Sequence, residues 1–494
     1  MIKLFESSEW SFDDILRMND EIAKIAHSEL KLDTYPNQIE IIDSEQMVDA
    51  YSSIGLPIMY HHWSFGKRFS QTWNSYRNGY QGLAYEIVIN SKPCISYLME
   101  QNSSTMQALV IAHAAYGHNH FFKNNYLFRE WTDADGILDY LVFAKNYIEE
   151  CEQKEGKTKV ELFLNSCHSL MNYGINRYKK PRKLRAAEEK ERKQQREAYN
   201  ESRINELYKA STTIKEEITH KLKEPEENIL YYCEKNSPKL ETWQRECIRI
   251  VRKLAEYFYP QPQTKVMNEG CATVTHHKIM TILHEKGMIA DGSYLEFLAS
   301  HSSVVYQPDF NSPRYSGLNP YKLGQEIFRD IERMCLTPTA EDKDWCKDIC
   351  NQDPGEVFLD IVKNYRDESF IRQFLSPKVI RDMKLFHLLD KVATDAYYVH
   401  SIHNDSGYND IRNVLALQHE REAYVPKIEI VEMNPDTRSL YLVYTQYNQR
   451  TLSNVDEMLT HVSVLWGGPV RITDNFGKPV TKILVEHSQG YYGC

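Results

Sequence analysis

In the stretch from Thr264 to His277, an uncharged helical pattern follows Glu269 and ends in a pair of histidines. Glu269 and His276 are seven residues apart, which is almost two turns of an α-helix, so both side chains face the same way. A carboxylate and an imidazole on one face of an apolar helix make half of a metal site. Alternatively, Glu269 caps the start of a helix and His276 is a buried histidine whose hydrogen bonds are satisfied within the core.

A second apolar helical pattern runs from 104 to 122 and carries three histidines. Two of them, His113 and His118, resemble the zinc-binding HExxH helix, but they are five residues apart rather than four. Five residues turn a regular α-helix by about 140° away from the first position. Both imidazoles can therefore reach one ion only if a π-bulge or a helix end near Gly117 turns His118 back toward His113. His120 lies seven residues from His113, almost two helical turns, and so fits one helix face better than His118 does.

Zinc enzymes typically bind the ion through three protein ligands and leave one position for water. His113, His118, Glu269 and His276 supply three or four such ligands. Imidazole and carboxylate ligands without thiolate suit Zn²⁺, and also Fe²⁺ or Mn²⁺. We therefore predict a divalent transition metal, with zinc favoured, at these four residues. The alternative is a set of buried histidines that are hydrogen-bonded to backbone carbonyls.

Ala114 stands where the HExxH helix has its catalytic glutamate, so a general base must come from elsewhere. We expect Glu246, or another carboxylate near the ion, to take this role. His301 or Tyr315 would stabilise an oxyanion, because both lie in or beside a loop rich in Ser, Pro, Asn and aromatic residues. His62 and His168 are further candidate imidazole ligands.

Other catalytic patterns are missing from the sequence: it has no GxSxG elbow, no P-loop, no GxGxxG and no kinase motifs. The net charge of −10 over 494 residues is mild and predicts no general attraction to nucleic acid or anionic lipid. The ten cysteines form no CxxC pair, which indicates free thiols. The first residues lack the apolar core of a signal peptide, and no window is apolar enough for a membrane span. We expect a cytoplasmic protein.

Helical patterns dominate the chain up to about residue 389, with one strand-like run from Tyr85 to Asn90. From Val425 onward, apolar residues recur at every second position, which is typical of β-strands. Alternating apolar residues predict two strands, 427–431 and 439–444, that form a hairpin around Asn434-Pro435. A helix at 454–465 and two further strands at 470–473 and 481–486 follow. We therefore predict a mainly α fold with a small C-terminal α+β domain.

The domain boundaries follow from changes in composition. We predict that 1–175 and 225–410 form one helical core and that 425–494 form the α+β domain. The segment 176–224 would be a charged helical arm or linker, because 177–197 contain ten basic and four acidic residues with few apolar ones. Acidic residues within this run argue against a nucleic-acid arm.

Several motifs together closely resemble the stage V sporulation protein R (SpoVR) family, and the resemblance covers nearly the whole chain. These motifs are Tyr35–Glu40, Tyr60–Lys67, Gly82–Asn90, His113–Asn125, Met267–Thr273, Asn311–Tyr321 and Glu368–Lys378. His113, His118, Glu269 and His276 match the family pattern. The sequence departs from it at His61, His120, Cys271, Val274 and His277, which removes His120 and His277 from the ligand set.

The resemblance implies a bacterial protein linked to formation of the spore cortex or to a stress response. It also implies a core similar to a degenerate glutamate-zincin, and partners that include a serine protein kinase and a von Willebrand-type protein. Two functions stay open. One is a metal-dependent hydrolase that acts on peptide or peptidoglycan amide bonds. The other is a non-catalytic assembly or regulatory protein that works with the kinase.

Overall fold

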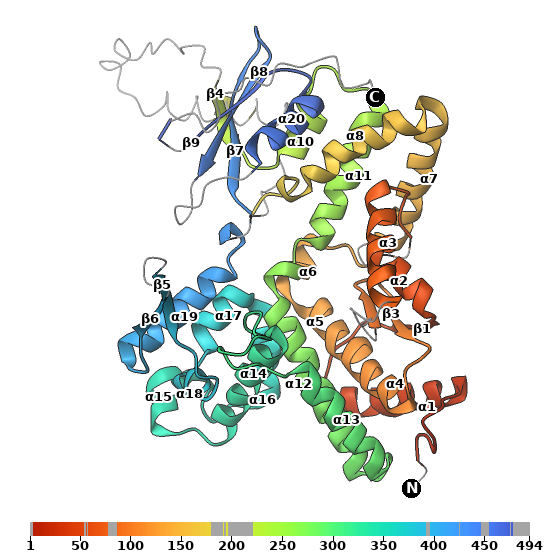
Figure 1. Ribbon diagram of the computed structural model, residues 1–494, viewed down its shortest axis with the longest axis vertical. Helices are drawn as coiled ribbons and strands as arrows, with labels where there is room; N and C mark the ends of the chain where they lie inside the picture. The colour runs from red at the N-terminus through yellow and green to blue at the C-terminus, as the bar shows by residue number, and fades with distance from the viewer. Residues whose placement is uncertain are drawn as a thin grey trace. The chain divides into compact units, whose positions relative to one another are not determined.

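The computed structural model describes residues 3–53, 56, 58–77, 86–178, 191, 194–195, 221–391, 396–423, 425–445, 454–474 and 476–477. The chain forms two compact units, which are 1–161 with 256–424, and 162–255 with 425–494. Both units are described separately. The mainly helical fold with small sheets confirms the predicted fold class (Figure 1). The units divide the chain differently from the predicted domains, because 162–255 joins the C-terminal segment.

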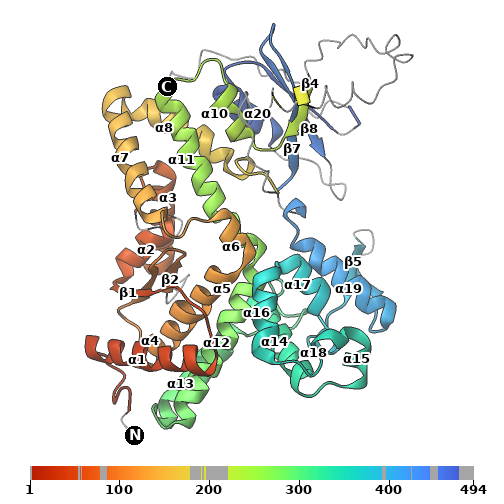
Figure 2. The same cartoon turned by 180° about the vertical axis from the view of Figure 1, so that it is seen from behind.

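A long helix, α12 (Lys265–Glu285), is the centre of the first unit (Figures 1 and 2). It packs against the π-helix η2 (Ile111–His118) and against α14 (Pro320–Leu336). Both contacts depend on glycine. A Cβ built on Gly117 would lie 2.6 Å from Cα of Ala272, and one built on Gly324 would lie 2.1 Å from the carbonyl oxygen of Val266. The backbones therefore approach more closely than any side chain at these positions would allow.

The helices around this centre form the rest of the N-terminal half of the unit. A capping box between Ser11 and Asp14 begins α1. The bounds are α1 (Phe12–Lys24), the π-helix η1 (Ile25–Glu29), α2 (Ser44–Ser52), α3 (Trp63–Arg77), α4 (Ser104–Val110), α5 (Asn119–Asn124), α6 (Tyr126–Trp131), α7 (Ile137–Glu155) and α13 (Asp291–Val304).

A three-stranded sheet lies beside these helices, in the order β1-β3-β2. Strand β1 (Asn37–Ile42) is parallel to β3 (Cys94–Met99), and β2 (Glu86–Ile89) is antiparallel to β3. The strand predicted at 85–90 is found as β2, whereas β1 and β3 were not predicted. Both β2 and β3 contact η2, so this sheet supports the histidine-bearing helix.

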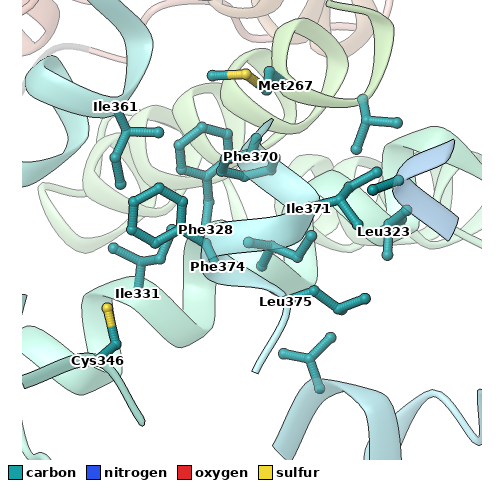
Figure 3. Close-up of a cluster of buried hydrophobic side chains, with 14 of the residues drawn as sticks. Met267, Leu323, Phe328, Ile331, Cys346, Ile361, Phe370, Ile371, Phe374 and Leu375 are labelled. Carbon is teal, nitrogen blue, oxygen red and sulfur yellow. The ribbon is translucent and has the colours of Figure 1, made fainter. Parts of the chain in front are cut away.

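A cluster of aromatic and aliphatic side chains joins the start of α12 to the helices that follow α14 (Figure 3). Phe328 on α14 packs against Phe370 on α17, with ring centroids 5.0 Å apart, and Met267 of α12 belongs to the same cluster. The elements here are α15 (Ala340–Cys346), α16 (Pro354–Asn364), α17 (Asp367–Phe374), α18 (Pro377–Asp382), the hairpin β5 (His387–Lys391) and β6 (Ala396–Ser401), and α19 (Asp405–Gln418).

The second unit contains a four-stranded sheet in the order β4-β7-β8-β9. The predicted hairpin is found as β7 (Lys427–Asn434) and β8 (Ser439–Thr445). Strand β9 (Val470–Asp474) is parallel to β8, and α20 (Val455–Trp466) connects them. The remaining elements are α8 (Lys157–Ser169), β4 (Lys221–Glu226), α10 (Ile229–Asn236) and α11 (Thr242–Phe258).

Two predicted features, the strand at 481–486 and most of the charged arm at 176–224, lie outside the described residues. Within the described part of the chain, every cysteine is a free thiol, and no helix combines the length and the apolarity that crossing a membrane requires.

The close approach of α12 and α14 predicts that Gly324→Ala is strongly destabilising. The added methyl group meets a backbone carbonyl that cannot move alone, so we expect the free energy of unfolding to fall by about 1–3 kcal/mol or more. Gly292→Ala is the matched control, because a Cβ there has open space around it in α13. That variant should be as stable as the wild type or up to about 1 kcal/mol more stable. Denaturant unfolding measures both, and equal stabilities would contradict the packing described.

Candidate metal centre

The histidine-bearing segment is a π-helix rather than a regular α-helix. Each backbone hydrogen bond of a π-helix spans five residues, and here the N–H of Asn119 donates to the carbonyl of Ala114. Residues five apart therefore lie almost above one another, which brings His113 and His118 to the same side. Their ring centroids are 4.6 Å apart and the rings are perpendicular. This local change in helix geometry is the one that the sequence spacing required.

Glu269 reaches both imidazoles from α12. Its Oε2 lies 3.7 Å from Nε2 of His113 and 3.5 Å from Nε2 of His118. All three side chains are largely buried, with 17% of the Glu269 side chain exposed and less of the two histidines. The structure thus brings these three predicted residues together.

A second carboxylate, Glu86, joins this cluster from the first residue of β2. Its Oε1 lies 3.4 Å from Nε2 of His113. Glu86, His113 and His118 offer ligand atoms that all lie within 4.8 Å of one another. Glu86 was not predicted as a site residue, although it is the only charged residue in the run from Glu86 to Ile89. The signal in the sequence that could have identified Glu86 was a single acidic residue at one end of an apolar strand.

The distances among these atoms fit a metal ion better than a set of hydrogen bonds. At 3.4–3.7 Å they are too long for hydrogen bonds. Two ligand atoms bound tetrahedrally at the Zn–N and Zn–O distances of proteins are separated by about 3.3 Å. In addition, the buried Oε2 of Glu269 has no hydrogen-bond partner among the described residues. Burying a carboxylate oxygen without a hydrogen-bond donor destabilises the folded state unless a cation binds to this oxygen.

His276, the fourth predicted ligand, lies behind His113 rather than beside the other three. Its Nδ1 is hydrogen-bonded to Nδ1 of His113 at 2.8 Å, and its Nε2 to Nδ1 of His301 at 2.8 Å. Both ring nitrogens are thus engaged with imidazoles. Glu86, and not His276, is therefore the fourth polar side chain on the Nε2 side of His113, and His276 supports His113 from its Nδ1 side.

The three predicted catalytic residues are placed differently from what the sequence suggested. His301 is in the cluster, but its nitrogens bond to His276 and to the side-chain amide of Gln325, so neither faces a substrate. Tyr315 packs on Phe310 in the 305–319 loop. Glu246 belongs to the second unit and pairs with Arg249 at 2.6 Å. Among the described contacts, none joins Tyr315 or Glu246 to the cluster.

Tyr321, six residues after Tyr315, is the tyrosine that reaches the cluster. Its ring is stacked on His113, with centroids 6.5 Å apart, and burial together with the charge of Glu269 raises the pKa of its hydroxyl. Pro320 and Tyr321 open α14, and the side chain of Asn319 caps this helix by accepting from the N–H of Tyr321. Tyr321 ends one of the family motifs, Asn311–Tyr321, but no role was predicted for it.

The other histidines singled out from the sequence are held away from this centre. His120 bonds through Nδ1 to the backbone of Asp33 at 3.0 Å, which agrees with its removal from the ligand set. His62 bonds to the hydroxyl of Ser64, and His168 lies on α8 in the second unit.

A second group of metal-ligating side chains occurs near the surface, at His387, His400 and Asp410. Asp410 already accepts hydrogen bonds there from Ser401 and from His387, and His400 is exposed. This group therefore has ordinary surface partners and serves below as a control.

Burial controls the charge state of the central cluster. It lowers the pKa of His118 to about 4 and depresses that of His276 well below the ordinary histidine value, with neighbouring imidazoles adding to the effect. Burial opposes ionisation of Glu269, yet the neighbouring imidazoles of His113 and His118 keep its pKa below the usual glutamate value. Burial also opposes ionisation of His113, but the carboxylates of Glu86 and Glu269 raise the pKa of this imidazole above its ordinary value. His118 and His276 are therefore neutral near neutral pH, as metal binding needs, whereas a metal ion must displace a proton from His113.

Two further contacts hold the ligands in place. The side-chain oxygen of Asn268 lies 2.9 Å from Nδ1 of His118, which leaves Nε2 of this histidine free for the cluster. The fully buried carboxylate of Asp367 accepts hydrogen bonds from the N–H groups of Val266 and Met267, at 2.8 and 2.9 Å. It thereby fixes the start of α12, one turn before Glu269.

Comparison with known proteins identifies the family. Residues 9–424 match the family described as SpoVR like protein, and residues 426–475 match the SpoVR-like C-terminal domain. The chain is 52% identical over 481 residues to the protein YcgB of Escherichia coli (strain K12), an alignment that covers 95% of this chain and 93% of that protein. No solved structure matches the chain. The chain belongs to the SpoVR family.

The position of Asp367 predicts a pH dependence of stability. Burial raises its pKa to about 7, above the ordinary aspartate value, so the folded state holds a proton that the unfolded chain releases near pH 4. This contribution to the free energy of unfolding is present below pH 4 and is lost as the pH rises through 7. Asp367→Asn cannot lose a proton, so the advantage of the wild type over this variant should shrink between pH 4 and pH 7.

Denaturant unfolding of both chains at several pH values, with a chelator present, measures this difference. Parallel stability curves for wild type and Asp367→Asn across the range would show that Asp367 does not titrate there.

Proposed function

We propose that this SpoVR-family protein binds one divalent transition metal through His113, His118 and Glu269 and hydrolyses amide bonds with it. The convergence of two imidazole nitrogens and one buried carboxylate oxygen without a hydrogen-bond partner carries this proposal. Two histidines and one glutamate are a known ligand set of catalytic zinc in peptidases. The donors suit zinc best, although Fe²⁺ and Mn²⁺ accept the same atoms.

Glu86 is the best-placed general base for such a reaction. Its carboxylate lies against His113 but comes from a different element, and 20% of its side chain is exposed, which is more than for His113 or Glu269. A carboxylate at the edge of the ligand set can accept a proton from water and later pass it to the leaving amine. Glu86 would thus do the work of the glutamate that Ala114 replaces in the HExxH pattern.

A bound metal would polarise the scissile carbonyl and lower the pKa of a water molecule beside Glu86. Tyr321 is the second polar group at the centre, since its ring stacks on His113. Burial and the charge of Glu269 raise the pKa of Tyr321 far above the ordinary value, so this hydroxyl keeps its proton. In this proposal the hydroxyl donates a hydrogen bond to a substrate oxygen at the metal.

Peptide or peptidoglycan amides are the substrate class of this proposal, because a ligand set of two histidines and one glutamate occurs in zinc peptidases. The proposed setting is formation of the spore cortex or a stress response, which the resemblance to the SpoVR family implies. Association with a serine protein kinase and a von Willebrand-type protein remains part of this proposal. A non-catalytic regulatory protein is the alternative, in which the same centre binds metal for structural purposes.

The first test is the metal content of the purified protein. We expect the wild type to retain about one transition-metal ion per chain, and His113→Ala, His118→Ala and Glu269→Gln each to retain less than about half of that, because each removes one of three ligands. Inductively coupled plasma mass spectrometry measures the content after dialysis. Circular dichroism confirms that each variant is folded.

His400→Ala is the matched control, since it alters the surface group of metal-ligating residues and leaves the buried centre intact. Its metal content should equal that of the wild type. A wild type without metal, or a content that falls in His400→Ala but not in His113→Ala, would refute the proposed centre.

The second test separates catalysis from metal binding. Glu86→Gln should keep its metal but lose about 10²–10⁴-fold in the rate of amide hydrolysis, the usual contribution of a general base. Release of free amines from soluble peptidoglycan fragments and from casein peptides, measured with fluorescamine, gives the rate for wild type and variant.

Each outcome of this second test has a distinct meaning. A metal-loaded wild type that releases no amine from either substrate would favour the non-catalytic alternative. Loss of metal from Glu86→Gln would make Glu86 a ligand rather than a base.

A further inference from the structure

A continuous chain of hydrogen bonds runs from the proposed metal ligand His113 into the core. Nδ1 of His113 bonds to Nδ1 of His276, Nε2 of His276 bonds to Nδ1 of His301, and Nε2 of His301 bonds to the side-chain amide of Gln325. The three bonds are 2.8, 2.8 and 2.9 Å long. All four side chains are buried, and they come from three different helices and the π-helix.

A neutral imidazole carries one N–H and one acceptor nitrogen, so each ring in such a chain fixes the next. The chain can therefore have only two directions. The group at its inner end, Gln325, decides between them, because one side of its amide donates hydrogen bonds and the other accepts them.

In the orientation observed, the amide nitrogen of Gln325 faces Nε2 of His301 and donates to it. His301 then carries its proton on Nδ1 and donates to His276, which carries its proton on Nδ1 and donates to His113. The remaining proton of His113 is on Nε2, which points toward Glu86 and Glu269. This direction suits the metal-free state, in which both carboxylates need a positive or donating partner.

The opposite direction suits the metal-bound state. A metal ion takes the lone pair of Nε2 of His113, so the proton of this ring must lie on Nδ1 and be donated to His276. His276 then donates from Nε2 to His301, and His301 donates from Nε2 to Gln325. This requires the amide oxygen of Gln325 in place of its nitrogen.

The observed structure contains the means for this reversal. Oε1 of Gln325 is buried and has no hydrogen-bond partner within the described part of the chain. A half-turn of the amide exchanges its oxygen and nitrogen with little change in shape, so this unpartnered oxygen would then accept the N–H of His301.

We propose that His276, His301 and Gln325 form a reversible relay in which the orientation of the Gln325 amide selects whether Nε2 of His113 holds a proton or a metal ion. This inference rests on the proposed function, because it needs a metal at His113. In the reversal, Nε2 of His113 releases its proton, and His113 receives a proton on Nδ1 from Nδ1 of His276. His276 receives a proton on Nε2 from Nδ1 of His301, and His301 receives a proton on Nε2 from solvent. Every ring stays neutral. The three residues are positioning residues, since none touches the ion.

The relay predicts opposite effects for two substitutions at Gln325. Glutamate, as a carboxylate, can only accept the hydrogen bond of His301, so Gln325→Glu should bind Zn²⁺ as tightly as the wild type or more tightly. Leucine can neither donate nor accept, so Gln325→Leu should raise the dissociation constant for Zn²⁺ by about 10–100-fold, as loss of a supporting hydrogen bond to a ligand does. Competition with a chromophoric chelator measures both constants without reference to catalysis.

Lys322→Met is the matched control for charge. It changes the net charge by −1, as Gln325→Glu does, and lies one helical turn away on α14, where Lys322 pairs with Glu326. Its dissociation constant should stay within about threefold of the wild type. A tightening in Lys322→Met equal to that in Gln325→Glu would assign the effect to charge and would overturn the relay.

A direct readout does not depend on any variant folding well. In protein labelled with ¹⁵N-histidine, long-range ¹H–¹⁵N correlation spectra distinguish a proton on Nδ1 from one on Nε2. We expect the proton of His301 to lie on Nδ1 without metal and on Nε2 with Zn²⁺. The signals are assigned from their loss in His301→Asn.

An unchanged His301 tautomer on metal binding, or an unchanged dissociation constant in Gln325→Leu, would overturn the relay while leaving the metal centre intact. A wild type that binds no Zn²⁺ would instead refute the metal centre itself. The two failures are therefore distinguishable.

Discussion

The close approach of α12 to the π-helix is the constraint on which the centre depends. Gly117 allows the backbone at Ala272 to come within a distance that a methyl group would fill. This contact brings the two imidazoles of the π-helix against Glu269 and His276 of α12. On the opposite side of α12, Gly270 and Gly324 allow an equally close approach of α14, which brings Tyr321 and Gln325 to the same place. Four glycine or alanine positions thus decide where the polar groups meet.

Burial of so many polar groups is costly, and the structure offsets most of this cost in pairs. His276 and His301 satisfy one another, Asn268 holds His118, and Asp367 takes the free N–H groups at the start of α12. Two of the buried oxygen atoms without hydrogen-bond partners in the described part of the chain belong to this centre, Oε2 of Glu269 and Oε1 of Gln325. The first lies 3.7 Å from Nε2 of His113, where the hydrogen-bond chain begins, and the second lies at the inner end of this chain. A metal ion would give the first oxygen a partner, and a rotated amide would let the second accept from His301.

The sequence predicted those parts of the centre that depend on local periodicity. The five-residue spacing of His113 and His118 required a π-bulge or a helix end near Gly117, and the structure has a π-helix there. The seven-residue spacing of Glu269 and His276 placed both on the side of α12 that faces His113. The spacing did not predict that Glu269 contacts Nε2 of His113 whereas His276 contacts Nδ1 of the same ring. Both contacts depend on how α12 packs against the π-helix, which lies far away in the sequence.

The parts that the sequence did not predict come from tertiary packing. Glu86 enters the centre through the pairing of β2 with β3 and the contact of this sheet with the π-helix. Tyr321, rather than Tyr315, reaches the cluster because the cap at Asn319 begins α14 there. Glu246 was predicted as a general base because Ala114 leaves that position open, but it belongs to the second unit and pairs with Arg249. The mainly helical class and the C-terminal hairpin followed from hydrophobic period alone.

Crystals of the protein measured at the absorption edges of zinc, iron and manganese give the most direct test of the account. An anomalous difference peak is expected within about 2.0–2.2 Å of Nε2 of His113, Nε2 of His118 and a carboxylate oxygen of Glu269. Anomalous maps in which these three atoms surround no ion, with a peak instead at His387, His400 and Asp410 or at none of these residues, would contradict it.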